Sequence, residues 1–464
     1  KITKQDVVEW ANKYLGPESY AIIYKREGKD PDEQKIAAPK ITPIVTNRDS
    51  QSEFLSEIQT SQVQPIEPVF VDYKKDMSQF EAQPGIDVLY KKNETNDIFT
   101  LIYVFNTGTE NDPALNLAFN YLSYLGTDKM TAEEIASKMY DIACSFYMNA
   151  GANQSSIQIT GLSENMGKAM EIVEGLIAGA KPDEAILENC KADMLKSRAD
   201  AKLNQSRCFG ALQRYLFYGG DFIRRTTLTD PALQALTSEQ LLAKIGGLMG
   251  KQHEVLYYGP QKEAEVKSAL AEHHKVAADL QPLEKKFSTL LPTDANKVVL
   301  AQYDAKQLYY LQFSNRGEKF DVAADPEITL YNEYFGGGMN TIVFQEMREA
   351  RGLAYTAWAT LATPSNANGD YSYYAFIATQ NDKMQKAVEA FDDIINNMPE
   401  SEKAFGIAKE ALVSRLRTER TVKDGVLWSY LRARDLGLDA PRDKQIFEKV
   451  QSMTLDDVKA AQQK

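Results

Sequence analysis

An internal repeat limits the fold of this chain more than any other feature of its sequence. A β-rich segment ends at Gly108, and a second one ends at Gly317, 209 positions later. Each is followed by a helical pattern that ends at another glycine, Gly126 in the first copy and Gly336 in the second, 210 positions apart. A repeat of this length is typical of two like domains in tandem.

The match continues through a further strand and a further helix. Residues 156–160 and residues 373–377 are the predicted strands. The next helix carries an apolar stripe in both copies, formed by Met166, Met170, Val173 and Ile177 and by Met384, Val388, Phe391, Ile395 and Met398. A later helix carries matching pairs, Tyr215 with Leu216 and Tyr430 with Leu431. We therefore expect an α/β (α+β) fold of two tandem homologous units, each a mostly antiparallel sheet with helices packed mainly on one face.

One type of helix start occurs three times. Thr3, Thr237 and Thr454 each precede a helical pattern with an acidic residue in its first turn, as expected for N-caps. After the Thr237 helix comes the predicted strand 254–258, and after the Thr3 helix comes the similar segment 20–24. We therefore expect residues 20–24 to be a strand of an absent sheet, either poorly ordered here or paired with a neighbouring chain. The chain is expected to begin in the remnant of an earlier unit and to stop before the last strand of its final unit.

These correspondences divide the chain into four parts. Residues 1–26 are the C-terminal remnant of a preceding unit. Residues 27–85, rich in proline and charge, are a linker with a short helix at 52–58. Residues 86–275 form the first complete unit, and residues 290–464 form a second unit that is truncated at its C-terminus. We therefore interpret the chain as part of a longer polypeptide.

Composition excludes several classes of function. With 53 basic and 65 acidic residues the net charge is −12, which argues against nucleic acid as a partner. No apolar run approaches the length of about 18 residues that suggests a membrane span. The first residues lack the apolar stretch of a signal peptide, so this fragment contains no targeting signal and the compartment stays open. Cys144, Cys190 and Cys208 have neither the spacing of a metal site nor an even number, and we expect plain buried thiols.

The sequence contains no self-contained catalytic arrangement. His253, His273 and His274 are the only histidines, and none has the i, i+4 spacing that places two imidazoles on one helix face for zinc. We expect His273 and His274 to end a charged helix, where a cation complements the dipole. No Gly-x-Ser-x-Gly motif is present. The glycine run 336–338 is predicted to end a helix with positive φ, because no Gly-Lys-Ser/Thr follows it.

Residues 334–355 contain three motifs in order: the glycine run, Phe-Gln-Glu-x-Arg and Arg-Gly-Leu-Ala-Tyr. This segment resembles the C-terminal homologous domain of the insulinase/pitrilysin (M16) family of zinc metallopeptidases. The resemblance covers the whole chain, because residues 86–275 resemble the family's N-type domain and residues 290–464 its C-type domain. It implies that the two units are arranged as half of a clamshell chamber.

The resemblance also implies that this N-type domain is degenerate. Active members carry an inverted zinc motif, His-x-x-Glu-His, on the helix before a Gly-Thr step, which is Gly126 and Thr127 here. The corresponding positions hold Leu117, Asn120 and Tyr121, none of which supplies an imidazole ligand or a carboxylate base. We expect no metal in this chain and no activity of the chain alone. Zinc would belong to the full-length enzyme or to a partner half.

Arg348 and Tyr355 match a second functional pattern of the family. Active members place an Arg and a Tyr seven residues apart in the C-type domain, and these two residues have that spacing. The resemblance implies that they bind a substrate carbonyl and stabilise the oxyanion of peptide hydrolysis. The alternative is that Arg348 only complements a helix end and Tyr355 is an edge residue of the core. Arg351 lies four positions from Tyr355 and lacks the spacing.

The resemblance therefore implies the C-terminal half of a zinc metalloendopeptidase. It would form a wall of the chamber and act on peptide substrates together with a zinc-bearing N-terminal half or a partner subunit. The alternative is a non-catalytic M16-like scaffold or peptide-binding subunit. An inverted His-x-x-Glu-His motif upstream of Lys1 would favour the enzyme, and its absence would favour the scaffold.

Overall fold

The computed structural model describes residues 2–16, 18, 20–25, 28, 52–62 and 64–463. The chain divides into two compact units, residues 1–65 and residues 66–464. In the first unit, α1 (Lys4–Tyr14) starts at a capping box in which Thr3 and Asp6 bond each other's backbone N–H groups. A second helix, α2 (Glu53–Thr60), follows. Both helices were predicted from the sequence.

Residues 20–25 of the first unit have no regular secondary structure, so the strand predicted at 20–24 is wrong for this structure. The side chains of Tyr20 and Ile23 are 67% and 91% exposed. The prediction rested on apolar and β-branched composition, which produces a strand only where a neighbour completes the backbone hydrogen bonds. Part of the predicted linker, including residues 29–51, lies outside the described residues.

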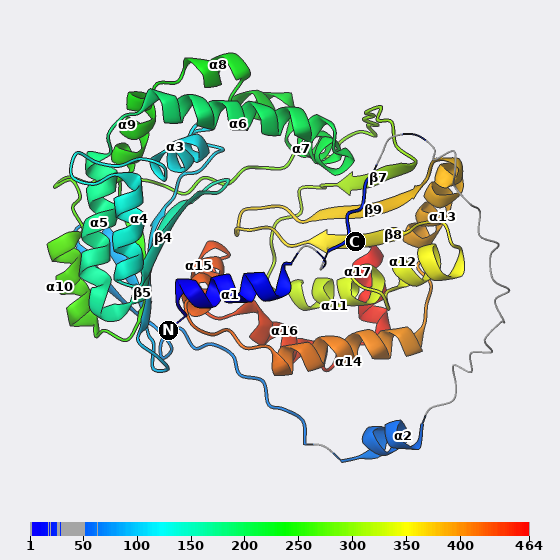
Figure 1. The fold of residues 1–464 in the computed structure, drawn as a ribbon. Coiled ribbons are helices and arrows are strands. Elements are labelled where there is room, and N and C mark those ends of the chain that lie inside the picture. Colours follow the sequence, from blue (N-terminus) through cyan, green and yellow to red (C-terminus); the bar gives the residue numbers. More distant parts are fainter. Residues whose placement is uncertain are drawn as a thin grey trace. The chain divides into compact units, whose positions relative to one another are not determined.

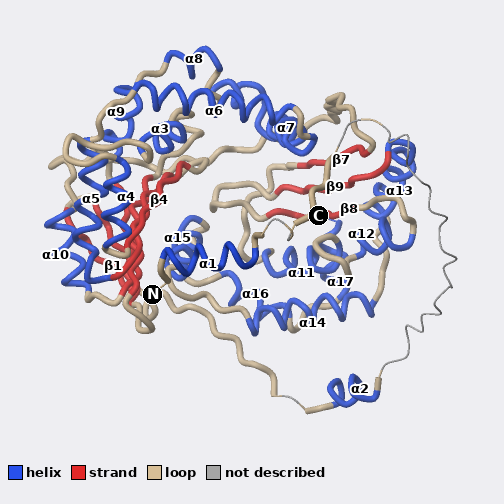
Figure 2. Tube along the Cα trace, in the orientation of Figure 1, coloured by secondary structure: helices blue, strands red, loops and turns tan. Residues whose placement is uncertain are grey.

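The second unit contains a six-stranded sheet (Figures 1 and 2). Its strands lie in the order β1 (Ser78–Gln83), β2 (Ile86–Lys92), β6 (His253–Gly259), β3 (Ile98–Phe105), β5 (Ser155–Leu162) and β4 (Cys144–Ala150). Neighbouring strands are antiparallel except for β2 and β6, which are parallel.

The edge strand β1 lies inside the range 27–85 that the sequence assigns to a linker. The sheet therefore starts before residue 86. Only Phe80 and Ala82 of this strand pack against the core, and its other side chains are polar. An edge strand of this kind lacks the apolar alternation on which the boundary was predicted.

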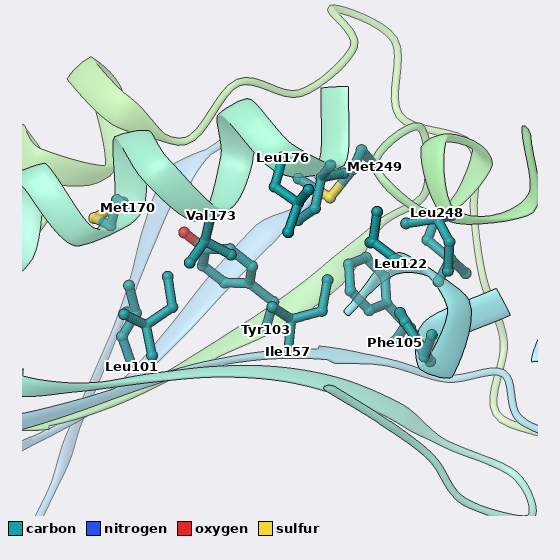
Figure 3. Close-up of a cluster of buried hydrophobic side chains, with 14 of the residues drawn as sticks. Leu101, Tyr103, Phe105, Leu122, Ile157, Met170, Val173, Leu176, Leu248 and Met249 are labelled. Carbon is teal, nitrogen blue, oxygen red and sulfur yellow. The ribbon is translucent and has the colours of Figure 1, made fainter. Parts of the chain in front are cut away.

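Helices cover one face of this sheet. They are α3 (Leu115–Leu122), α4 (Ala132–Asp141), α5 (Met166–Gly179), α6 (Glu184–Lys202), α8 (Asp230–Ala235), α9 (Ser238–Leu248) and α10 (Glu263–His273). Figure 3 shows how Leu101, Tyr103 and Phe105 of β3 project toward this helical layer, where Val173 and Leu176 of α5 lie. The stripe predicted for α5 is buried in this core, so burial of apolar surface fixes the helix on the sheet.

A second sheet has three antiparallel strands, in the order β7 (Gln307–Ser314), β9 (Ser372–Gln380) and β8 (Thr356–Ala362). This order repeats β3, β5 and β4 of the first sheet, as the internal repeat predicts. The core against this sheet contains α11 (Asp325–Phe335), α13 (Met384–Asn396), α14 (Glu402–Thr418), α16 (Arg442–Val450) and α17 (Leu455–Gln463). The predicted fold class, with mostly antiparallel sheets packed against helices, is confirmed.

One helix of each repeat packs against the sheet of the other repeat. From the second repeat, α15 (Gly425–Asp435) packs on the other face of the first sheet, in a cluster of Leu89, Ile102, Val104, Leu256, Val426, Leu427 and Leu431. From the first repeat, α7 (Gln205–Thr226) places the ring of Phe217 4.7 Å from Phe313 and 5.2 Å from Tyr374. These two helices carry the matching Tyr-Leu pairs of the repeat. Corresponding helices of the two repeats therefore each pack against the sheet of the other repeat.

An ion pair ties α15 to the first sheet. Arg434 donates to both carboxylate oxygens of Glu254 on β6, at 2.5 and 2.9 Å. Glu254 is only 9% exposed, so this bidentate pairing offsets the cost of burying its charge. The two repeats are thus joined by polar as well as apolar contacts.

Candidate functional site

Arg348 lies in a helix that changes its hydrogen-bond pattern. The short helix α12 (Ile342–Phe344) continues as a π-helix over Gln345–Ala350. At its end the Arg351 N–H donates to the Glu346 carbonyl, an i to i−5 bond of 3.2 Å. Gly352 then stops the helix at a φ of +57°, which a glycine adopts without strain. Short π-helical stretches are rare and are frequent at functional sites.

Tyr355 follows this turn and comes directly before β8. Its N–H donates to the Ala378 carbonyl at 3.1 Å, so the sheet fixes its backbone, while the residue is 71% exposed. The Arg348 guanidinium carbon lies 5.1 Å from the centre of the Tyr355 ring and 4.9 Å from that of Phe344. The two predicted site residues are therefore neighbours at the surface, and Tyr355 is not a core residue.

The neighbouring arginine has a different environment. Arg351 lies 3.4 Å from a carboxylate oxygen of Glu346 and 3.6 Å from one of Asp393 on α13. Arg348 has Glu349 at 3.5 Å, and both of these side chains are exposed, so their ion pair is weak. Arg351 lies near two carboxylates, whereas Arg348 lies against aromatic rings.

The positive φ predicted for the glycine run beside this site is wrong for Gly336. Gly336 follows α11 as predicted, but its φ is −135°, so a positive φ does not explain the glycine. A Cβ at this position would lie 2.0 Å from the Ala359 carbonyl oxygen of β8. The Ala359 N–H also donates to the Gly336 carbonyl at 3.0 Å. Close packing of the helix end on the strand requires the glycine.

The positions of the inverted zinc motif do not fit a metal. Leu117 and Tyr121 lie on the buried side of α3 with no exposed surface, whereas Asn120 is exposed. The Tyr121 hydroxyl donates to Ser238 Oγ at 2.8 Å and accepts from the Asp183 N–H at 2.8 Å. Throughout the part of the chain that the structure describes, no group of three His, Cys, Asp or Glu side chains is placed to hold a metal ion.

Sequence reasoning missed a buried polar network in the first repeat. His253 begins β6, His274 follows α10 and Glu174 lies on α5, and each is at most 6% exposed. The imidazoles meet at 2.8 Å between their Nε2 atoms, and His274 Nδ1 lies 2.6 Å from Glu174 Oε1. His274 is therefore enclosed in the core rather than exposed as a helix-terminal cation. These residues are far apart in the sequence, so no local pattern indicates that they meet.

The hydrogen bonds of this network determine which imidazole nitrogens carry protons. The Lys251 carbonyl can only accept, so His253 Nδ1 carries a proton and donates to it at 2.7 Å. Burial and the neighbouring His274 lower the pKa of His253 to about 4, so its Nε2 is an acceptor at neutral pH. His274 Nε2 must then be the donor to it.

Two of the three cysteines agree with the prediction of buried thiols. Cys144 and Cys190 are buried, Cys208 is partly buried, and all three are free thiols. Burial raises the pKa values of Cys144 and Cys190, which makes both poor nucleophiles.

The fold and this motif together define a class of peptidase-related domains, and comparison with known proteins identifies it. Residues 252–412 match the family model described as the peptidase M16 inactive domain. A Streptomyces coelicolor protein named "uncharacterized zinc protease" is 22% identical over 266 residues, which are 53% of this chain and 56% of that protein. Residues 252–412 are thus similar to the M16 inactive domain, in agreement with the resemblance read from the sequence.

Solved structures share the fold. The peptidase M16 inactive domain from Pseudomonas fluorescens has a TM-score of 0.65 at 18% identity, covering 83% of this chain and 93% of that one. The periplasmic protease PqqL from Escherichia coli has a TM-score of 0.65 at 13% identity, covering 99% of this chain and 49% of that one. This chain thus spans about half the length of PqqL and 56% of the Streptomyces relative. None of the described helices is long and apolar enough to cross a membrane.

Proposed function

We propose that this chain is the C-terminal half of an M16 zinc metalloendopeptidase. In this proposal residues 86–275 are a degenerate N-type domain, residues 290–464 are the C-type domain, and residues 1–26 belong to a preceding unit. Zinc and the inverted motif belong to the other half, which lies in the same polypeptide or in a partner subunit. Peptides are the substrates.

The observation that carries the proposal is the pairing of Arg348 with Tyr355 at an exposed surface. Both residues stand in a motif typical of the family, and the guanidinium lies 5.1 Å from the phenol ring. The guanidinium presents several N–H donors in a fixed plane, which suits a peptide carbonyl oxygen. The phenol adds an O–H donor. Such donors accelerate hydrolysis when they bond the oxyanion more strongly than the ground-state carbonyl.

The π-helix and the sheet support this role because they fix both backbones. Met347, next to Arg348, is fully buried in the core of the second repeat. The carbonyl of Met347 accepts from the Leu353 N–H at 2.9 Å, which fixes the turn between the two site residues. Donors held in this way need little reorganisation when the substrate reacts.

A non-catalytic scaffold or peptide-binding subunit is the second candidate. It is favoured by the buried Leu117 and Tyr121, which supply no zinc ligand at the positions of the inverted motif. The matched family model is also that of an inactive domain. In a scaffold, Arg348 and Tyr355 would still bind peptide carbonyls without taking part in a reaction.

The test compares two arginines in the full-length protein with a quenched fluorescent peptide. Arg348→Ala should lower kcat by about a hundredfold or more and also raise KM, because one donor of this kind contributes about that much. Arg351→Ala is the matched control and should retain nearly full activity. The catalytic role is overturned if Arg348→Ala is fully active or if only Arg351→Ala is inactive. Peptide binding without hydrolysis by the wild-type protein would select the scaffold.

A further inference from the structure

We propose that Phe344 is a positioning residue of this site, whose ring holds the Arg348 guanidinium in place beside Tyr355. The catalytic consequence rests on the proposed function. The ring contact itself rests only on the geometry of this chain. Phe344 would touch no reacting atom and would act through Arg348.

Two rings meet the same guanidinium. The Arg348 guanidinium carbon lies 4.9 Å from the ring centre of Phe344 and 5.1 Å from that of Tyr355. Phe344 comes from the helix and Tyr355 from the start of β8, so the two rings reach the guanidinium from different elements. A guanidinium that lies over aromatic faces keeps its N–H groups in its own plane, free to bond an acceptor.

Phe344 is held more firmly than Arg348. It is the last residue of α12, and its neighbour Val343 is fully buried. Phe344 itself is half-buried, at the boundary between the core and the site. The π-helix begins at the next residue, so Phe344 also lies where the helix widens. A ring on a fixed backbone can restrict a long side chain that is 40% exposed.

The ion pair with Glu349 cannot replace this restraint. The charged groups are 3.5 Å apart, and the two side chains are 40% and 53% exposed. Exposed pairs of this kind hold their partners weakly and are screened by salt. Glu349 is also adjacent in sequence on the same solvent-facing turn. The ring contact is therefore the stronger candidate for fixing the guanidinium.

The kinetic test uses the full-length protein. Phe344→Leu should lower kcat by about three- to thirtyfold with a smaller change in KM, the range that a cation–π contact supplies. Phe344→Tyr keeps a ring and should retain activity. In an Arg348→Ala background, Phe344→Leu should have no further effect. An equal loss in both backgrounds, or no loss in either, would overturn the inference.

A control separates the site from general packing. Phe447→Leu also removes a half-buried ring near an arginine, since its centre lies 5.8 Å from the Arg417 guanidinium carbon. This variant should keep the wild-type kcat. A loss as large as that of Phe344→Leu would indicate that both changes act through packing, which would contradict a positioning role.

A spectroscopic measurement keeps the inference independent of the reaction. In this 464-residue chain, the Arg348 Nε–Hε resonance should be shifted by the rings above it and is assigned by its loss in Arg348→Lys. Phe344→Leu should move it toward the position of a free arginine, and Phe344→Tyr should not. An unmoved resonance in Phe344→Leu overturns the ring contact. If the shift appears but Arg348→Ala is fully active, the proposed function fails while the ring contact stands.

Discussion

The two sheets contain the same antiparallel triplet but differ in what surrounds it. In the first sheet β3 has neighbours on both sides, β6 and β5. Among the described strands of the second sheet, β7 pairs with β9 alone. The segment before β7 is apolar but irregular, and its Val298 and Leu300 are 84% and 86% exposed. The difference shows that an apolar segment forms a strand only where a neighbouring strand completes its backbone hydrogen bonds.

The candidate positions of the two repeats differ in exposure. In the first repeat Tyr121 has no exposed surface, and Glu174, His253 and His274 bond one another inside the core. The second repeat keeps Tyr355 71% exposed beside Arg348. Buried, fully bonded groups stabilise a fold, whereas exposed donors are available to a ligand. This exposure supports our proposal that the functional site lies in the second repeat.

The largest effect is expected from placing histidines at the two buried positions of the zinc motif. Leu117→His with Tyr121→His should lower the free energy of unfolding by about 4 kcal/mol, because polar rings replace packed groups in the core. Urea denaturation measures the loss, and elemental analysis should find no stoichiometric zinc. Asn116→His with Asn120→His has the same spacing on the exposed side of α3 and should change the free energy of unfolding little. A stable double variant that binds one zinc would contradict the packing described for the first repeat.

A second prediction tests the buried network through pH. The pKa of His253 is lowered to about 4 in the folded chain, below its ordinary value of 6.5. As pH falls through this window the unfolded state takes up a proton that the folded state does not, so stability is lost. The loss should reach about 3 kcal/mol at pH 4 and vanish above pH 6.5.

Urea denaturation between pH 7 and pH 4 measures this effect, with two variants for comparison. His273→Asn changes a histidine outside the network and should keep the steep dependence on pH. His253→Asn should be less stable at pH 7 and should show a shallower dependence. Equal slopes for all three proteins would contradict the neutral, bonded His253.

The smallest effect concerns the sheets themselves. Amides of β7 that do not bond to β9 should exchange with deuterium at least tenfold faster than the matching amides of β3, which has a neighbour on each side. Mass spectrometry of peptides that cover residues 98–105 and 307–314 measures the difference. Equal protection would mean that β7 has a second neighbour in solution, and the contrast between the sheets would then be wrong.

The sequence predicts the parts of the fold that have local signals. The repeat, the apolar strands of its two copies and the capping threonines Thr3 and Thr237 appear in the structure, whereas the strand predicted at residues 20–24 does not. It does not predict the polar edge strand β1, because only two of its side chains reach the core. The reason for Gly336 was also missed, because a close approach to Ala359 is a tertiary contact.

The candidate site, too, is only partly predictable from the sequence. The spacing of Arg348 and Tyr355 marks them in the sequence. Their contact with the ring of Phe344 depends on a π-helix, for which the sequence has no recognised signal. The network of Glu174, His253 and His274 joins three elements far apart in the chain, so no periodicity reveals it.

The kcat of a Tyr355→Phe variant of the full-length protein tests the proposed function most directly. Removing this donor should lower kcat by about a hundred- to a thousandfold, equivalent to about 3 to 4 kcal/mol, with a smaller change in KM. Because Tyr355 is 71% exposed, the free energy of unfolding should change by less than about 1 kcal/mol. An unaltered kcat in a folded, zinc-loaded protein would contradict the role of the phenol in stabilising the oxyanion.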